Sequence, residues 1–139
     1  MTVPTKPLQD RDSEVFDQTA LMHLVGGDRD LLKEIVGLFL ETAPSLLQGI
    51  RDAAGRGDSS GLTTAVHALR GAARNFYAPR IEQATLVLEQ MGQSRDLQNA
   101  LAACVALETE LDKLRPLLLS MLRDAEDGTQ DHDYSDRRR

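Results

Sequence analysis

Several residue types are scarce in this 139-residue chain, and each absence excludes a class of protein. Its one cysteine, Cys104, rules out a disulfide framework within the chain. With three scattered histidines as the other candidates, no zinc-ligand spacing is present, and we expect no metal site. No apolar run approaches the roughly 18 residues that a membrane span needs. Because the N-terminus also lacks a basic-then-apolar signal, we expect a cytoplasmic protein that does not bind membranes.

Positive charge is also in short supply. The chain has 22 Asp and Glu against 16 Lys and Arg, so its formal net charge is −6. A nucleic-acid binder needs a basic face to meet the phosphate backbone, so we expect no nucleic-acid partner. The arginines at 137–139 do not change this expectation, because five acidic residues lie between positions 126 and 136.

Residues that favour strands are few. The chain has five aromatic residues, no tryptophan, and only 10 valines and isoleucines together, against 22 leucines and 15 alanines. Leucine and alanine are good helix formers, whereas β-branched and aromatic residues favour strands. We therefore predict an all-α fold with an aliphatic core, and a chain of this length suits a single domain.

Apolar residues recur at helical spacing in five segments that are separated by glycine, proline or capping residues. These segments predict helices over residues 16–25, 28–55, 59–77, 79–91 and 94–124. Pro44 should kink or split the second helix at Thr42–Ala43, and Pro116 is a second kink point. Short connections favour an antiparallel up-and-down four-helix bundle with a short additional N-terminal helix. We assign this domain to residues 14–125, between a flexible leader (1–13) and a disordered charged tail (126–139).

The spacing of apolar residues also predicts which positions are buried. The expected core stripes of the second and last helices comprise Leu31, Ile35, Leu38, Phe39, Leu46, Leu47 and Ile50, and then Leu97, Leu101, Cys104, Val105, Glu108, Leu111, Leu118 and Leu122. Phe16, Phe39 and Phe76 are predicted to fill the core, and Cys104 to be an inert buried thiol. Leu21 and Leu24 fit either the core or an exposed docking patch.

The third predicted helix has one histidine on its polar side. On a helical wheel Leu62, Ala65, Val66, Leu69, Ala72, Ala73 and Phe76 form one apolar arc. His67 falls opposite that arc, beside Thr63, Arg70, Gly71 and Arg74. We therefore predict that the imidazole of His67 faces solvent.

Three features of this polar side need an explanation. Gly71 is unfavourable inside a helix by about 1 kcal/mol relative to alanine, which makes sense if another molecule must approach His67 closely. Arg70 and Arg74 stand beside the histidine in a stretch, 59–81, that contains no acid. An imidazole is largely neutral at pH 7, and its nitrogen is a competent nucleophile toward phosphorus. The pattern indicates a histidine that accepts a phosphoryl group, and a solvated face with a chance histidine is the alternative.

The residues from His67 to Ala78, HALRGAARNFYA, resemble the signature of histidine-containing phosphotransfer (HPt) domains. That signature is a histidine followed by x-Leu-Lys-Gly, two small residues and an Asn-apolar-Gly-Ala stretch. The similarity covers about residues 14 to 122. It includes Phe16-Asp17, Phe39-Leu40-Glu41-x-Ala43-Pro44, Gly57-Asp58 before Leu62, and Leu88-Glu89.

The resemblance implies a four-helix bundle that takes a phosphoryl group on His67 from a receiver-domain aspartate and passes it to, or back to, another receiver. Arg70 matches the lysine beside the phosphate, Gly71 the glycine that admits the receiver, and Glu89 a polar position near the site. Arg74 would add to the cationic surround. The implied partners are a response-regulator receiver domain and a sensor or hybrid histidine kinase.

The resemblance also implies that this chain needs no cofactor of its own, because the receiver would supply the aspartate and Mg²⁺. No glycine loop for ATP is visible, so the chain would be a phosphotransfer intermediate and not a self-contained enzyme. A closed bundle can be a monomer, and we expect one. Two alternatives stay open: a non-catalytic helical adaptor that binds a receiver or kinase, and a module excised from a larger hybrid or chemotaxis kinase.

Three residues depart from the family pattern. Arg70 replaces lysine, which keeps the charge on a bulkier, forked side chain. Val66 replaces the alanine before the histidine, which affects packing. Tyr77 replaces a glycine that the family uses for close helix approach, so we expect altered packing or a partner contact there.

Overall fold

Every regular element in the described part of the chain is a helix. The computed structural model describes the backbone of residues 15–137 and the side chains of residues 15–125. The elements are α2 (Gln18–Leu24), α3 (Arg29–Arg56), α4 (Ser59–Ala73), the 3₁₀ turn η1 (Arg74–Phe76), α5 (Pro79–Ser94) and α6 (Ala100–Arg137). The predicted all-α class is confirmed. The predicted leader, residues 1–13, lies outside the described residues.

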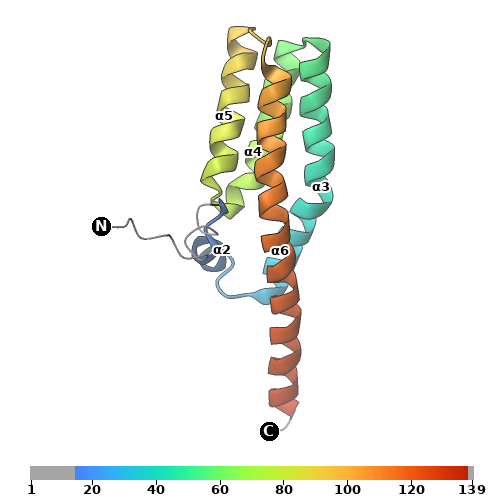
Figure 1. Ribbon diagram of the computed structural model, residues 1–139. Helices are drawn as coiled ribbons and strands as arrows, with labels where there is room; N and C mark the ends of the chain where they lie inside the picture. Colours follow the sequence, from blue (N-terminus) through green and yellow to red (C-terminus); the bar gives the residue numbers. More distant parts are fainter. Residues whose placement is uncertain (1–14, 138–139) are drawn as a thin grey trace, which may run out of the picture.

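Helices α3 to α6 form a closed ring of four. Helix α4 packs against α3 and α5, and α6 packs against the same two helices (Figure 1). The short helix α2 contacts η1 at one end of the bundle. This arrangement confirms the predicted bundle with a short additional N-terminal helix.

The core is mostly aliphatic and includes three phenylalanines. Phe16, Phe39 and Phe76 are buried, as predicted, and the rings of Phe39 and Phe76 lie 4.8 Å apart at 56°. That tilted geometry suits the opposite charges of ring edge and ring face. The one fully buried polar side chain among the described residues, Thr85, donates from Oγ1 to the carbonyl of Glu82 at 2.7 Å. The core therefore carries no cost for an unbonded threonine hydroxyl.

Aspartates begin three of the helices. Asp17 caps α2, Asp28 caps α3, and Asp58 caps α4, where its Oδ1 accepts from the backbone N–H of Gly61 at 2.9 Å. A side-chain acceptor at this position satisfies a backbone donor that the first helical turn leaves free. Gly57 closes α3 in the left-handed conformation, with φ 71°. Two residues, Gly57 and Asp58, thus turn the chain from α3 into α4.

Neither proline splits its helix, and two predicted helix boundaries are wrong. Helix α3 continues through Pro44, and α6 through Pro116, without a break. Helix α5 passes Gly92 and ends at Ser94, and α6 begins at Ala100, not at Ser94. A proline removes one backbone hydrogen bond, and burial of the residues around Pro44 is sufficient to hold the helix together across that loss.

Gly92 continues α5 because of what it packs against. It is buried, and a Cβ at this position would overlap Oγ1 of Thr63 on α4 and lie 3.1 Å from the carbonyl oxygen of Ser59. The glycine therefore permits close contact between α4 and α5. Sequence alone suggested a helix end here, since glycine more often marks one.

The predicted stripe of α3 is partly wrong. Phe39, Leu47 and Ile50 are buried, but Leu31 and Leu38 are exposed, while Leu32 and Val36 lie in the core. Residues 31–40 include apolar side chains on nearly every side of the helix. Their periodicity therefore does not determine which side faces α4 and α6.

Helix α6 differs from its prediction in the same way. Cys104 and Leu118 are buried as expected, but Leu101 and Val105 are more than half exposed. The deepest positions include Leu107 and Leu114, which the predicted stripe omitted. Glu108, predicted on that stripe, lies at its edge and pairs with Arg51 of α3.

The backbone of α6 remains helical to Arg137, where the sequence predicted a disordered tail from residue 126. Figure 1 shows this part of α6 extending past the bundle. A helix that is already formed gains one hydrogen bond for each residue added, so a polar composition does not by itself end it. Along the described chain, none of the helices has the length and apolar character required to cross a membrane.

Tyr77 takes a backbone conformation that usually belongs to glycine. Its φ and ψ are 50° and 56°, in the left-handed region that closes η1. The backbone N–H of Asp17 donates to the carbonyls of Phe76 and Tyr77, at 3.2 and 3.1 Å, and so ties the start of α2 to this turn. A glycine at this position would adopt the same backbone conformation without steric cost.

Replacing Tyr77 tests this explanation. We expect Tyr77→Gly to raise the free energy of unfolding by about 0.5–1 kcal/mol, since glycine adopts positive φ without steric cost. Tyr77→Val should lower it, because a β-branched residue is strained at positive φ. Urea unfolding followed by circular dichroism measures both. The opposite order of the two variants would contradict the explanation.

Cys104 gives the fold a dependence on alkaline pH. Burial raises the pKa of the Cys104 thiol above its usual value, although the charge of Arg51 lowers it in part. The folded state thus holds this proton more tightly than the unfolded state. The stability it contributes is complete below the usual thiol pKa and is lost as pH rises through the higher folded-state pKa.

We therefore expect the free energy of unfolding to fall more steeply with pH, on the alkaline side, in the wild type than in Cys104→Ala. Urea unfolding at a series of pH values measures both slopes. Equal slopes would show that the thiol stays protonated in both states throughout that range.

Candidate functional site

Burial of one side of α4 determines where His67 points. Leu62, Val66, Leu69 and Ala73 are buried against the neighbouring helices. His67 lies on the other side of the helix, and 54% of its side chain is exposed. The predicted solvent-facing position of His67 is confirmed.

A glutamate from the neighbouring helix reaches this histidine. Oε2 of Glu89, on α5, lies 2.5 Å from Nε2 of His67. Oε1 of the same carboxylate accepts a hydrogen bond from Nη1 of Arg70 at 2.9 Å. The structure thus brings together three of the predicted site residues, one from α5 and two from α4.

The three side chains differ in exposure. Only 12% of the Glu89 side chain and 21% of that of Arg70 are exposed, so the ion pair is largely shielded from water. Oε2 of Glu89 is buried and accepts no hydrogen bond from the described residues. Its contact with His67 is an ion pair only when the imidazole is protonated. The Oε1 atom of the carboxylate is therefore held by Arg70, whereas its Oε2 atom is held less firmly.

The electrostatic surroundings of His67 differ from what α4 alone suggests. The sequence predicted a cationic surround, because residues 59–81 contain no acid. Glu89 enters from α5 and neutralises part of the charge of Arg70. A wheel of one helix cannot show this. The signal in the sequence is that Glu89 follows Leu88, a core residue, on a helix expected to lie beside α4.

Gly71 and Arg74 lie on the same helical side without joining the ion pair. A Cβ built on Gly71 would meet nothing within 4 Å, so the surface beside His67 is open at this point. Arg74 is exposed, and within the described residues it makes no ion pair. It lines a small hollow with Arg70, Tyr77 and Glu82, among others. Its guanidinium is thus available to an incoming anion.

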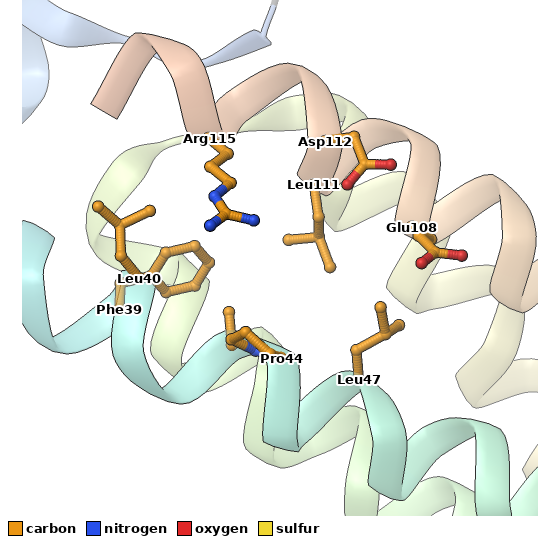
Figure 2. A pocket seen from close by; sticks show the side chains of 9 residues that line it. Phe39, Leu40, Pro44, Leu47, Glu108, Leu111, Asp112 and Arg115 are labelled. Carbon is orange, nitrogen blue, oxygen red and sulfur yellow. The ribbon is translucent and has the colours of Figure 1, made fainter. Parts of the chain in front are cut away.

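A second hollow lies between α3 and α6. Its volume is about 170 Å³, and Figure 2 shows Phe39, Leu40, Pro44 and Leu47 from α3 facing Leu111 and Arg115 from α6. Glu108 and Asp112 also line it. The walls are mostly apolar and include no histidine, cysteine or serine. This hollow therefore lacks the side chains that most often carry a transferred group.

Helix α2 and Cys104 add no reactive group to the site around His67. Leu21 is fully buried whereas Leu24 is 47% exposed, so only the second of them could contact a partner. Cys104 is buried, as predicted. Across the residues described, no group of three or more His, Cys, Asp or Glu side chains is placed to hold a metal ion.

Comparison with known proteins identifies one family. Residues 34–116, more than half of the chain, match the family model described as the Hpt domain. The matched stretch contains His67, Arg70, Gly71, Arg74 and Glu89. Searches of curated proteins and of solved structures returned no match.

Two glycines give a matched test of the open surface at His67. We expect Gly71→Ala to raise the free energy of unfolding by about 1 kcal/mol, because the added methyl meets nothing and alanine favours the helix. Gly92→Ala should lower it, because its methyl would overlap Thr63. Urea unfolding compares the same substitution at both positions. If Gly71→Ala also lowered stability, Gly71 would have a role within the bundle.

Proposed function

Because this chain belongs to the Hpt domain family, and so has a histidine phosphotransfer role in a phosphorelay, we propose that His67 is the residue that carries the phosphoryl group. The observation that carries this proposal is the exposure of His67 on the side of α4 opposite the core. The other two histidines of the chain, His23 and His132, both lie outside the matched stretch of residues 34–116.

The transfer reaction follows from the atoms present. A lone pair on the imidazole attacks the phosphorus of a receiver's aspartyl phosphate. The nitrogen–phosphorus bond forms as the phosphorus–oxygen bond breaks, and the electron pair stays on the aspartate carboxylate. The second ring nitrogen keeps its proton. Arg70 and Arg74 supply positive charge to the transferred group, and charge-assisted hydrogen bonds of this kind contribute about 1.5–3 kcal/mol when well formed.

Hpt domains interact with receiver domains and histidine kinases in phosphorelays. For this chain we propose a response-regulator receiver domain as the direct partner, in the cytoplasm, with the aspartate and Mg²⁺ on the receiver. The open surface at Gly71 supports close approach of that partner. The same chemistry serves transfer in either direction, since the phosphoryl group moves between one nitrogen and one oxygen.

Substitution of His67 tests the proposal. We expect His67→Gln to take no phosphate from the phosphorylated receiver domains of the host, while its circular dichroism spectrum stays that of the wild type. The wild type should gain the mass of one phosphate, and brief acid treatment should remove it. His23→Gln, at another exposed histidine, is the control and should be labelled normally.

Acid-labile label retained in His67→Gln would contradict the assignment. A wild-type chain that binds a phosphorylated receiver and takes no label would instead be the non-catalytic adaptor. The intact set of His67, Arg70 and Gly71 supports the phosphotransfer protein over that adaptor.

A further inference from the structure

The carboxylate of Glu89 occupies the two contacts that a phosphoryl group on His67 would need. Its Oε2 lies 2.5 Å from Nε2 of His67, and its Oε1 accepts from Arg70 at 2.9 Å. A phosphoryl group bonded to Nε2 would place its own anionic oxygens in the same space and beside the same guanidinium. Carboxylate and phosphoryl group cannot both hold these positions.

Partial burial of Glu89 makes it unfavourable for its carboxylate to lie beside a phosphoryl group on His67. Glu89 is 12% exposed and comes from α5, whose backbone is fixed by packing against α4 and α6. Two anions at close range repel each other more strongly where water is partly excluded. Its buried Oε2 accepts no hydrogen bond within the described chain, so the protein does not hold this oxygen in place by any other means.

Given the proposed function, we propose that Glu89 competes with the phosphoryl group for His67 and Arg70, and thereby shifts the transfer equilibrium toward the receiver. Before transfer, Arg70 is paired with Glu89. During transfer the imidazole is neutral with its proton on Nδ1, so the lone pair of Nε2 forms the nitrogen–phosphorus bond. The phosphorus–oxygen bond to the receiver aspartate breaks, and its electron pair remains on that aspartate. The Glu89 carboxylate turns away, and Arg70 exchanges it for the phosphoryl oxygens.

Return of the phosphoryl group to a receiver reverses each of these changes. Glu89 pairs with Arg70 again and no longer faces a second anion at Nε2, so the unphosphorylated form of the site is favoured relative to the phosphorylated form. Glu89 then affects the equilibrium between phosphohistidine and aspartyl phosphate, whereas the bonds form and break at His67. Removing its charge should shift the position of the transfer equilibrium toward the phosphohistidine.

Two variants at this position separate charge from shape. Glu89→Gln keeps the size of the side chain and a carbonyl oxygen for Arg70, whereas Glu89→Ala also frees Arg70. Glu110→Gln is the matched control, because Glu110 is likewise a largely shielded glutamate with one buried oxygen that accepts no hydrogen bond from the described residues. It lies on α6 and pairs with Lys113.

The experiment mixes each purified chain with a phosphorylated receiver domain that labels the wild type, and measures the ratio of phosphohistidine to aspartyl phosphate at equilibrium. Phosphoramidate, a small donor that needs no docking surface, labels the chains separately, and the decay of the label gives the lifetime of the phosphohistidine. We expect both Glu89 variants to raise the ratio about tenfold and to lengthen the lifetime, since removal of a nearby like charge favours the second anion. Glu110→Gln should match the wild type.

The outcomes are distinct. If the wild type is labelled and the Glu89 variants keep its ratio and lifetime, the competition is overturned and the proposed function stands. If the Glu89 variants lower the ratio, Glu89 supports the phosphorylated form, which also overturns it. If neither a receiver nor phosphoramidate labels the wild type, the proposed function fails and the competition fails with it.

Discussion

The burial of one side of α4 between α3 and α5 is the constraint on which the site depends. Leu62, Val66 and Leu69 are fully buried, and each loses about 1.5–3 kcal/mol of favourable transfer free energy if exposed. Rotating α4 to hide His67 would expose all three. The exposure of His67 is thus enforced by the hydrophobic effect, and the histidine needs no partner of its own to stay at the surface.

This constraint explains why the apolar pattern of α4 predicts the orientation of that helix, whereas the patterns of α3 and α6 predict their buried residues only in part. The apolar residues of α4 occupy one arc, so the wheel orients the helix without ambiguity. In α3 and α6 leucines lie on several sides, and Leu31, Leu38, Leu101 and Val105 were placed in the core although they are exposed. Which leucines are buried depends on the positions of two neighbouring helices, and that information is not contained in either helix alone.

The contact between Glu89 and His67 likewise depends on how neighbouring helices are placed, which the pattern of one helix does not show. The residues are 22 positions apart, on different helices, and their distance depends on how closely α4 and α5 pack. Gly92 decides that closeness, because any side chain there would meet Thr63. The family pattern places a polar residue near the site, but only the packing shows that its two oxygens face the histidine and Arg70. The pattern of α4 alone thus predicted that His67 faces solvent, and the packing of α5 against α4 shows which side chains surround it.

Every residue of the candidate site lies on α4, α5 or the turn that directly follows α4, and none lies on a long loop. A partner therefore meets a backbone that folding has already ordered, and binding need not immobilise a mobile segment. The entropy lost on association is then confined to a few side chains, chiefly those of His67, Arg70 and Arg74. Such a surface suits brief encounters, in which a protein must bind, exchange one group and separate again, because neither association nor release waits for a loop to fold.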